Sequence, residues 1–192
     1  MCGILLNDCK RRKESIYNMR EIYKKRPDGE IGTEEKAIYD VLEKLNLSFE
    51  RADRVKSDNV DEEIYKLLRI RHLKNLLLCN ASKSSFYLLV MPADVPFKSA
   101  VLSKQLGTSR FSFAPEEYLL EFLHAKSGCA SILGLIFDTQ KKVELVIDQR
   151  VLEDEYFGCL PCNENSSIKF NTKALLEKLL SYTGHHYTIV RM

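Results

Sequence analysis

The chain is poor in several features that mark particular classes of protein. It has no tryptophan, so aromatic contacts fall to nine tyrosines and nine phenylalanines. No run of about 18 apolar residues is present, and the sequence therefore predicts no transmembrane helix. The 29 basic and 27 acidic residues nearly cancel to a net charge of +2. This balance lacks the strongly basic footprint of many nucleic-acid-binding proteins, although it leaves room for a local basic patch.

Signatures of several enzyme classes are missing too. The chain contains no GxSxG, no P-loop, no GxGxxG and no HExxH. A Ser–His–Asp arrangement stays open because triads assemble in space rather than in sequence, but no serine has an evident base nearby. The opening stretch places its charges after a very short apolar run, which is the reverse of a secretory signal. We therefore expect a cytoplasmic protein whose six cysteines are free thiols.

What is present is the composition of one globular domain. The 192 residues are 45% apolar and 29% charged. Helical spacing or helix boundary signals predict helices at 9–26, 33–45, 58–68, 99–107, 114–124 and 171–184. Short apolar or alternating runs predict strands at 47–51, 75–80, 85–91, 109–114, 130–138, 141–148 and 166–170. Because the strands come as hairpins rather than in regular βαβ alternation, we expect an α+β fold with a mixed or antiparallel sheet.

Helix boundary signals support two of these helices. Thr33 is placed to N-cap the helix at 33–45, and Pro115 to occupy the first turn of the helix at 114–124. Residues 1–30 read as an N-terminal helical extension, and residues 31–192 as the main domain. The basic face of the 9–26 helix is either a solvated surface or a nucleic-acid contact.

The stretch "HLKNLLLCN" places Lys74 and Asn75 directly before an apolar run. Burying an unpaired ammonium costs several kcal/mol. Lys74 must therefore reach water or meet an anionic or carbonyl-rich partner, while Asn75 could satisfy a turn. Farther along, the stretch "SGCASILGLIFD" contains Gly128 and Gly134. Glycine inside a strand pattern marks either a kink or the close approach of a ligand.

The motif "CLPC" at 159–162 is a single CxxC pair. Zinc needs about four ligands, and a second pair at close spacing is missing. A thioredoxin-like role would require the pair to open a helix after a strand, whereas here "NENSS" follows. We therefore rank a metal-binding or redox protein third among the possible functions, after the two described in the following paragraphs.

From about Glu34 onward the chain resembles the YbaK-like aminoacyl-tRNA editing family, and within it the free-standing prolyl-tRNA editing branch of the ProX or PrdX type. The stretches that carry the resemblance are "LKNLLL", "FYLLVMPAD", "SKQLGTSRFSFAPEEYL", "SGCASILGLIFD", "VELVID" and "EYFGCLPCNENSSIKF". It implies a curved, barrel-like mixed sheet with surrounding helices. It also implies a trans-editing hydrolase that deacylates mischarged tRNA, for this branch alanyl-tRNA(Pro), without metal or cofactor. The implied partners are tRNA(Pro) and prolyl-tRNA synthetase, with no membrane.

The resemblance also implies roles for particular residues. Lys74 matches the active-site lysine and Asn75 its neighbour in the catalytic pair. The implied substrate-binding residues are Gly128, Ser131, Gly134 and Leu160, with no metal ligand.

Three positions depart from the family pattern. Ile132 stands where a proline is usual, and Leu160 and Arg54 stand where histidines are usual. The implied pocket is less polar. The alternative function is therefore a catalytically weakened or inactive module that binds tRNA or prolyl-tRNA synthetase.

Overall fold

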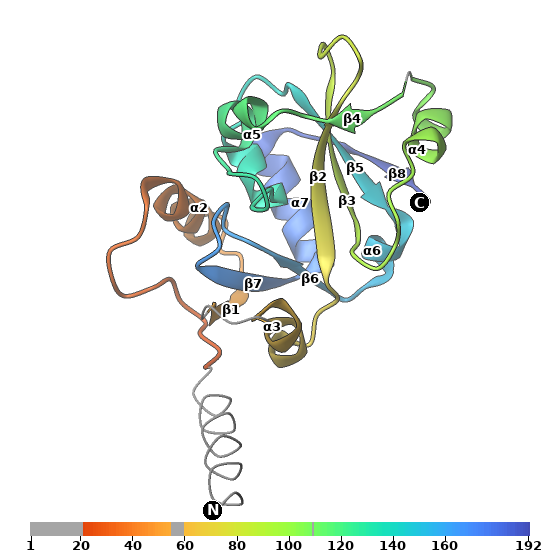
Figure 1. Ribbon diagram of the computed structural model, residues 1–192. Coiled ribbons are helices and arrows are strands. Elements are labelled where there is room, and N and C mark those ends of the chain that lie inside the picture. Colours follow the sequence, from red (N-terminus) through yellow and green to blue (C-terminus); the bar gives the residue numbers. More distant parts are fainter. Residues whose placement is uncertain (1–20, 55–59, 109) are drawn as a thin grey trace, which may run out of the picture.

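The computed structural model describes residues 21–54, 60–108 and 110–192 (Figure 1). The helices are α2 (Thr33–Lys44), α3 (Val60–Leu68), α4 (Ser99–Leu106), α5 (Glu116–Leu123), the 3-10 helix η1 (Ile132–Ile136), α6 (Gln149–Glu153) and α7 (Thr172–Thr183). The strands are β1 (Phe49–Asp53), β2 (Leu73–Cys79), β3 (Phe86–Pro92), β4 (Ser112–Phe113), β5 (Val143–Asp148), β6 (Tyr156–Cys159), β7 (Ser166–Asn171) and β8 (Tyr187–Val190). The predicted α+β class is confirmed.

The strands form two sheets rather than one closed barrel over the described residues. The smaller sheet is antiparallel with the order β1-β7-β6, and the larger one has the order β4-β2-β3-β5-β8. The larger sheet is mixed, because β3, β5 and β8 run parallel whereas β2 is antiparallel to β3. The predicted hairpin is confirmed, with Leu73 opposite Pro92 and Cys79 opposite Phe86. Its turn is held by the Asn80 side-chain oxygen, which accepts a hydrogen bond from the Ser84 amide at 2.9 Å.

One edge of β2 is partly open. β4 pairs with β2 only at Leu78 and Cys79. Among the described residues, β2 therefore has a strand partner on the β3 side alone from Leu73 to Leu76. An open strand edge leaves backbone N–H and C=O groups without a strand partner. These groups, and the side chains on both faces of the strand, can be reached from that side. The open stretch contains the Lys74–Asn75 pair.

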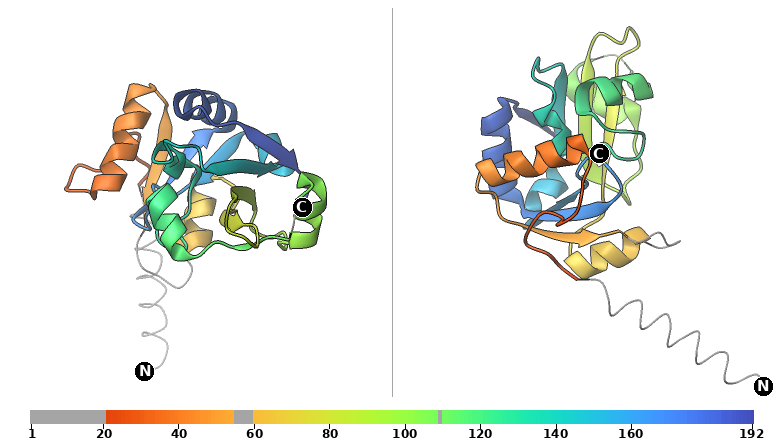
Figure 2. Two further views of the ribbon diagram at one scale, coloured as in Figure 1. Left: turned by 90° about the horizontal axis from the view of Figure 1, so that it is seen from above. Right: turned by 90° about the vertical axis from the view of Figure 1, so that its left-hand side faces the viewer.

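Two hydrophobic clusters lie on opposite faces of the larger sheet. Figures 1 and 2 show the helices around this sheet, with α4 and α7 on different sides. Leu77 of β2 belongs to the larger cluster, together with residues of α2, α5, η1 and α7. Its neighbour Leu78 belongs to the smaller cluster, which includes Leu102 of α4. Successive side chains of a strand point to opposite faces. The same alternation directs Lys74 toward the α4 side and Asn75 toward the η1 side.

Several predicted helix ends are confirmed and two are corrected. Gly107 and Gly184 follow α4 and α7 in the left-handed conformation, with φ of 63° and 68°. Pro115 is the N-cap of α5 rather than its first helical residue, because its ψ of 152° is extended. Gly32, not Thr33, is the N-cap of α2, and no side chain caps that helix.

The strand predicted at 130–138 is wrong. Residues Ile132–Ile136 form the 3-10 helix η1, and the Ser131 side chain accepts a hydrogen bond from the Leu133 amide at its start. Ile132, Leu133 and Leu135 are all buried, so the run shows no alternation between buried and exposed positions that would separate helix from strand. The strand predicted at 109–114 shrinks to the two residues of β4.

The predicted helix at 9–26 lies mostly outside the described residues. Its last part, from residue 21, is not helical. Tyr23 instead forms an antiparallel bridge with Arg51, with hydrogen bonds of 2.8 and 2.7 Å in the two directions. Arg26 binds Asp40 at 2.6 Å and Glu43 at 3.2 Å on α2. No helix in the part of the chain that the structure describes is long and apolar enough to span a membrane.

Candidate functional site

The Lys74 ammonium is held by backbone carbonyls. Its Nζ donates hydrogen bonds to the carbonyl oxygens of Ala93, at 3.3 Å, and Val95, at 2.5 Å. The hairpin register explains this contact. Lys74 lies opposite Met91, so the residues that follow β3 pass close to the lysine side chain. Of the alternatives left open by the sequence, the structure shows the carbonyl-rich partner. An ammonium has three protons, so one donor remains for a ligand.

A cleft opens beside these carbonyls. It is lined by Arg71, His72, Ala93 and Asp94. The His72 ring stacks on the Tyr65 ring of α3, with centroids 4.3 Å apart and planes 24° apart. The sequence interpretation missed this cleft. A signal was available, since residues two apart on a strand share a face and His72 precedes Lys74 by two positions.

Asn75 lies within β2, and the expectation that it satisfies a turn is wrong. Its side-chain oxygen Oδ1 is buried and has no hydrogen-bond partner among the described residues. Leaving such an acceptor unpaired costs about 1–3 kcal/mol. A donor supplied by a ligand would recover that cost.

The glycine-containing segment follows α5. Gly128 has a φ of 84°, which favours glycine, and lies in the turn that leads to Ser131 and η1. A Cβ on Gly134 would lie 2.8 Å from the Leu123 carbonyl oxygen and 3.2 Å from the Cys162 sulfur. Gly134 therefore permits close approach of the protein's own backbone. This contact explains Gly134 without invoking a ligand.

The loop after β6 packs against the same segment. Leu160 is half-buried in this loop, between the buried residues Cys159 and Cys162. Glu35 of α2 is only 1% exposed and accepts hydrogen bonds from the side-chain amides of Asn163, at 2.8 Å, and Asn165, at 3.3 Å. The loop is therefore fixed by a buried carboxylate about 130 positions away in sequence.

Arg54 also meets this loop. Its amide donates to the Asn165 carbonyl oxygen at 2.8 Å, and its guanidinium donates to the Ser167 hydroxyl at 3.2 Å. Arg54 thus lies near the loop that carries Leu160. Both residues stand at positions where a histidine is usual.

The cysteines of the CxxC motif are free and buried. Burial raises the pKa of the Cys159 thiol to about 12, and it also raises the pKa of the Cys162 thiol. Thiolates are the nucleophilic form of cysteine, so both buried thiols are poorly suited to act as redox nucleophiles at neutral pH. Among the described residues, no group of three or more His, Cys, Asp and Glu side chains is arranged to hold a metal.

The structure brings the segment of Ser131 and Gly134 together with the Leu160 loop, whereas Lys74 and Asn75 lie on β2. The turn after α5 lies on the side of β2 that faces away from β3 (Figure 1).

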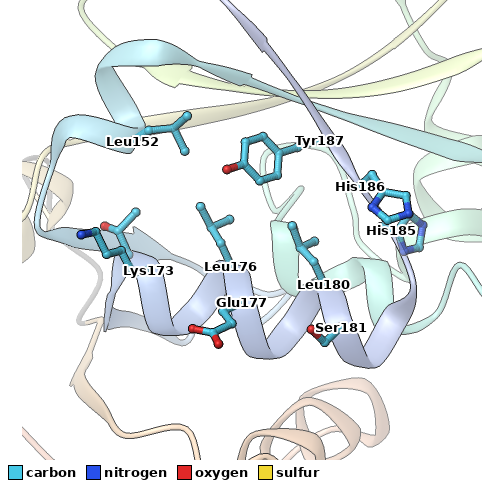
Figure 3. A pocket seen from close by; sticks show the side chains of 10 residues that line it. Leu152, Lys173, Leu176, Glu177, Leu180, Ser181, His185, His186 and Tyr187 are labelled. Carbon is cyan, nitrogen blue, oxygen red and sulfur yellow. The ribbon is translucent and has the colours of Figure 1, made fainter.

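A second groove, of about 680 Å³, lies between α7 and β8 and contains none of the predicted site residues (Figure 3). His185 and His186 both line it, but His185 is buried and His186 is exposed. His185 Nε2 lies 3.2 Å from the Asp138 carboxylate, which also accepts the amides of Lys142 and Val143. This pair anchors the loop after α7 to the start of β5.

The fold and site define an α+β domain in which two backbone carbonyls anchor a lysine of a strand that has one partly open edge. Residues 62–178 match the aminoacyl-tRNA editing domain, and the chain belongs to this family.

Relatives support the same placement. The chain is 26% identical over 145 residues to "Prolyl-tRNA editing protein ProX" of Acetoanaerobium sticklandii, covering 76% of this chain and 82% of the relative. It is 29% identical over 157 residues to "Prolyl-tRNA synthetase associated domain-containing protein 1" of Danio rerio, covering 78% and 83%. A solved structure described as a candidate trans-editing enzyme for prolyl-tRNA synthetase shares the fold, with a TM-score of 0.63 at 12% identity over 85% of this chain and 99% of that one.

Proposed function

We propose that the protein is a trans-editing hydrolase that deacylates mischarged tRNA, with alanyl-tRNA(Pro) as its substrate. Membership of the editing family and the prolyl-tRNA names of its relatives support the substrate class. The observation that carries the chemistry is the Lys74 ammonium, which two carbonyls of the segment after β3 hold with one N–H to spare.

The reaction splits the ester between the amino acid and the terminal ribose. A water attacks the ester carbonyl carbon, and the carbon–oxygen bond to the ribose then breaks. The leaving ribose oxygen takes a proton, which gives free tRNA and free amino acid. We assign the remaining Lys74 N–H to the oxyanion that develops on the carbonyl. A donor held in place before the reaction needs no reorganisation as the charge appears.

The amino acid would lie on the η1 side of the edge. Asn75 offers an unpaired buried oxygen that can accept a hydrogen bond from the α-ammonium of the substrate. In this proposal Gly128, Ser131 and Gly134 belong to the opposite wall. Ser131 and Gly134 are buried, so they would shape it through the packing of η1 against α5, and half-buried Leu160 lies on the adjoining loop.

The two substitutions beside this wall should act differently. Ile132 is fully buried in the larger cluster, so its effect on the pocket is exerted through packing. Leu160 removes a donor that a histidine would supply. A lost neutral hydrogen bond is worth about 0.5–1.5 kcal/mol, which attenuates a reaction rather than abolishing it.

The remaining features of the proposal follow from this chemistry. An aminoacyl ester is already activated, so we propose that the reaction needs neither metal nor cofactor. Residues 31–192 would form the editing domain and residues 1–30 an N-terminal extension. The protein would work in the cytoplasm, where tRNA is charged, with prolyl-tRNA synthetase as a partner.

The second candidate function is a binding module for tRNA or prolyl-tRNA synthetase that has lost catalysis. Leu160 and Arg54, which stand where histidines are expected, favour it. A deacylation screen across mischarged tRNAs separates the two functions. We expect release of alanine from alanyl-tRNA(Pro) above the rate without protein. Binding of tRNA with no release from any charged tRNA would instead establish the module.

A further inference from the structure

We propose that the cleft lined by Arg71, His72, Ala93 and Asp94 binds the 3′-terminal nucleotide of the tRNA, with the base stacked on His72. This inference rests on the proposed function, because it assigns the part of the substrate that sits next to Lys74. The argument starts from three neighbouring features of the cleft.

The first feature is an aromatic platform. His72 is exposed and its ring stacks on the half-buried Tyr65 at 4.3 Å. The backing by Tyr65 restrains the imidazole at the cleft wall. A hydrogen bond of 2.9 Å from the Ala93 amide to the His72 carbonyl oxygen also fixes the backbone there. Every nucleobase has a flat face, and stacking on such rings is a general way to hold single-stranded ends.

The second feature is a pair of opposite charges on the cleft wall. The Arg71 guanidinium is held through Nε by Asp154 at 3.1 Å, and its side chain remains 44% exposed. A guanidinium restrained in this way can donate to a phosphate. Asp94 is exposed, and its carboxylate can accept hydrogen bonds from ribose hydroxyls. Base, ribose and phosphate thus each have a matching group.

The third feature is the position of the cleft relative to Lys74. Ala93 lines the cleft, and its carbonyl oxygen accepts one of the Lys74 hydrogen bonds. The amino acid of a charged tRNA is esterified to the ribose of the terminal nucleotide. A nucleotide in this cleft therefore brings the ester to the spare N–H of Lys74. A free nucleotide could use the same contacts to its base and phosphate. Binding of a free nucleotide would not explain why the cleft lies next to Lys74.

The test uses two uncharged minihelices of the tRNA(Pro) acceptor stem, one ending in CCA and one ending in CC. Their binding to the full chain is measured by fluorescence anisotropy. We expect wild type to bind the CCA form about tenfold more tightly, the scale of one stacked base. His72→Ala should remove this preference, and His72→Phe, which keeps a flat ring, should retain it.

A matched control is His186→Ala, which removes another exposed histidine from the groove beside α7. It should keep the full preference for CCA. Equal binding of the two minihelices by wild type, including no binding of either, would overturn the proposal. A preference that persists in His72→Ala would overturn it as well.

Because the minihelices carry no amino acid, this result is independent of catalysis. If wild type deacylates no charged tRNA but prefers CCA through His72, the proposed function fails and the cleft assignment stands. If wild type releases alanine, we expect His72→Ala to raise KM about tenfold with little change in kcat. An unchanged KM, with no preference for CCA, would overturn the cleft assignment while the proposed function stands.

Discussion

Gly134 should tolerate no side chain. A Cβ added there would lie 2.8 Å from the Leu123 carbonyl oxygen, 2.9 Å from the Leu123 Cβ and 3.2 Å from the Cys162 sulfur. The oxygen belongs to the last residue of α5, so the clash is relieved only if η1 and α5 move apart. Overpacking of a well-packed core costs about 1–3 kcal/mol. With two contacts under 3.0 Å, we expect Gly134→Ala to lower the free energy of unfolding by about 2 kcal/mol.

Urea denaturation followed by circular dichroism measures this change, and Gly29→Ala provides the matched control. A Cβ on Gly29 meets nothing within 4 Å, so its effect should stay within about 0.5 kcal/mol. The same displacement of η1 should disturb Ser131 and slow deacylation. A Gly134→Ala protein as stable as the Gly29→Ala protein would refute the packing argument.

Three further predictions concern the rest of the molecule. Burial raises the pKa of Asp148, but hydrogen bonds from Arg150 and the Met192 amide outweigh it and place the pKa below its usual range. The stabilisation is therefore present at neutral pH and lost as the pH falls below about 4; Asp148→Asn should cost about 2 kcal/mol at pH 7 and flatten this acid dependence in urea titrations. Iodoacetamide near neutral pH should leave Cys159 and Cys162 unmodified in the folded protein but alkylate both in urea; peptide mass mapping that finds either one modified in the native state would contradict their burial. Dialysis against EDTA should leave the deacylation rate unchanged, and a loss of rate restored by added metal would exclude the metal-independent reaction.

The hairpin of β2 and β3 and the helix α7 could be predicted because local chemistry determines them. The apolar runs on either side of the Asn80 turn pair with each other, and Gly184 ends α7 in the left-handed conformation. The parallel pairing of β3 with β5 and of β5 with β8 could not be predicted in the same way, since it depends on contacts distant in sequence. The short elements β6, β8 and α6, of four or five residues each, were also missed.

The error at η1 has a different cause. Ile132, Leu133 and Leu135 are all buried, so their hydrophobicity carries no period. The Ser131 hydroxyl accepts a hydrogen bond from the Leu133 amide and so favours a helical turn over a strand at this point. Serine often precedes an apolar run, so its presence here does not by itself predict a helix.

Within the candidate site, the sequence led to the prediction of a role for Lys74 but not to the contact that holds it. The Ala93 and Val95 carbonyls lie about 20 positions later and reach the lysine only through the register of the hairpin. Glu35 reads as an ordinary acid in a first helical turn, yet it is buried beneath the Asn163 and Asn165 amides. Such long-range polar contacts leave no periodic trace in a sequence.

The most direct test of the proposed function is the single-turnover release of alanine from alanyl-tRNA(Pro) by wild type and Lys74→Ala. Loss of one preorganised donor should slow the reaction about 10²–10³-fold. Lys104→Ala, which removes an exposed lysine from α4, should react at the wild-type rate. Thermal unfolding of each variant controls for the two carbonyls left unpaired at Ala93 and Val95. A folded Lys74→Ala protein that releases alanine as fast as wild type would contradict the assignment of the lysine to catalysis.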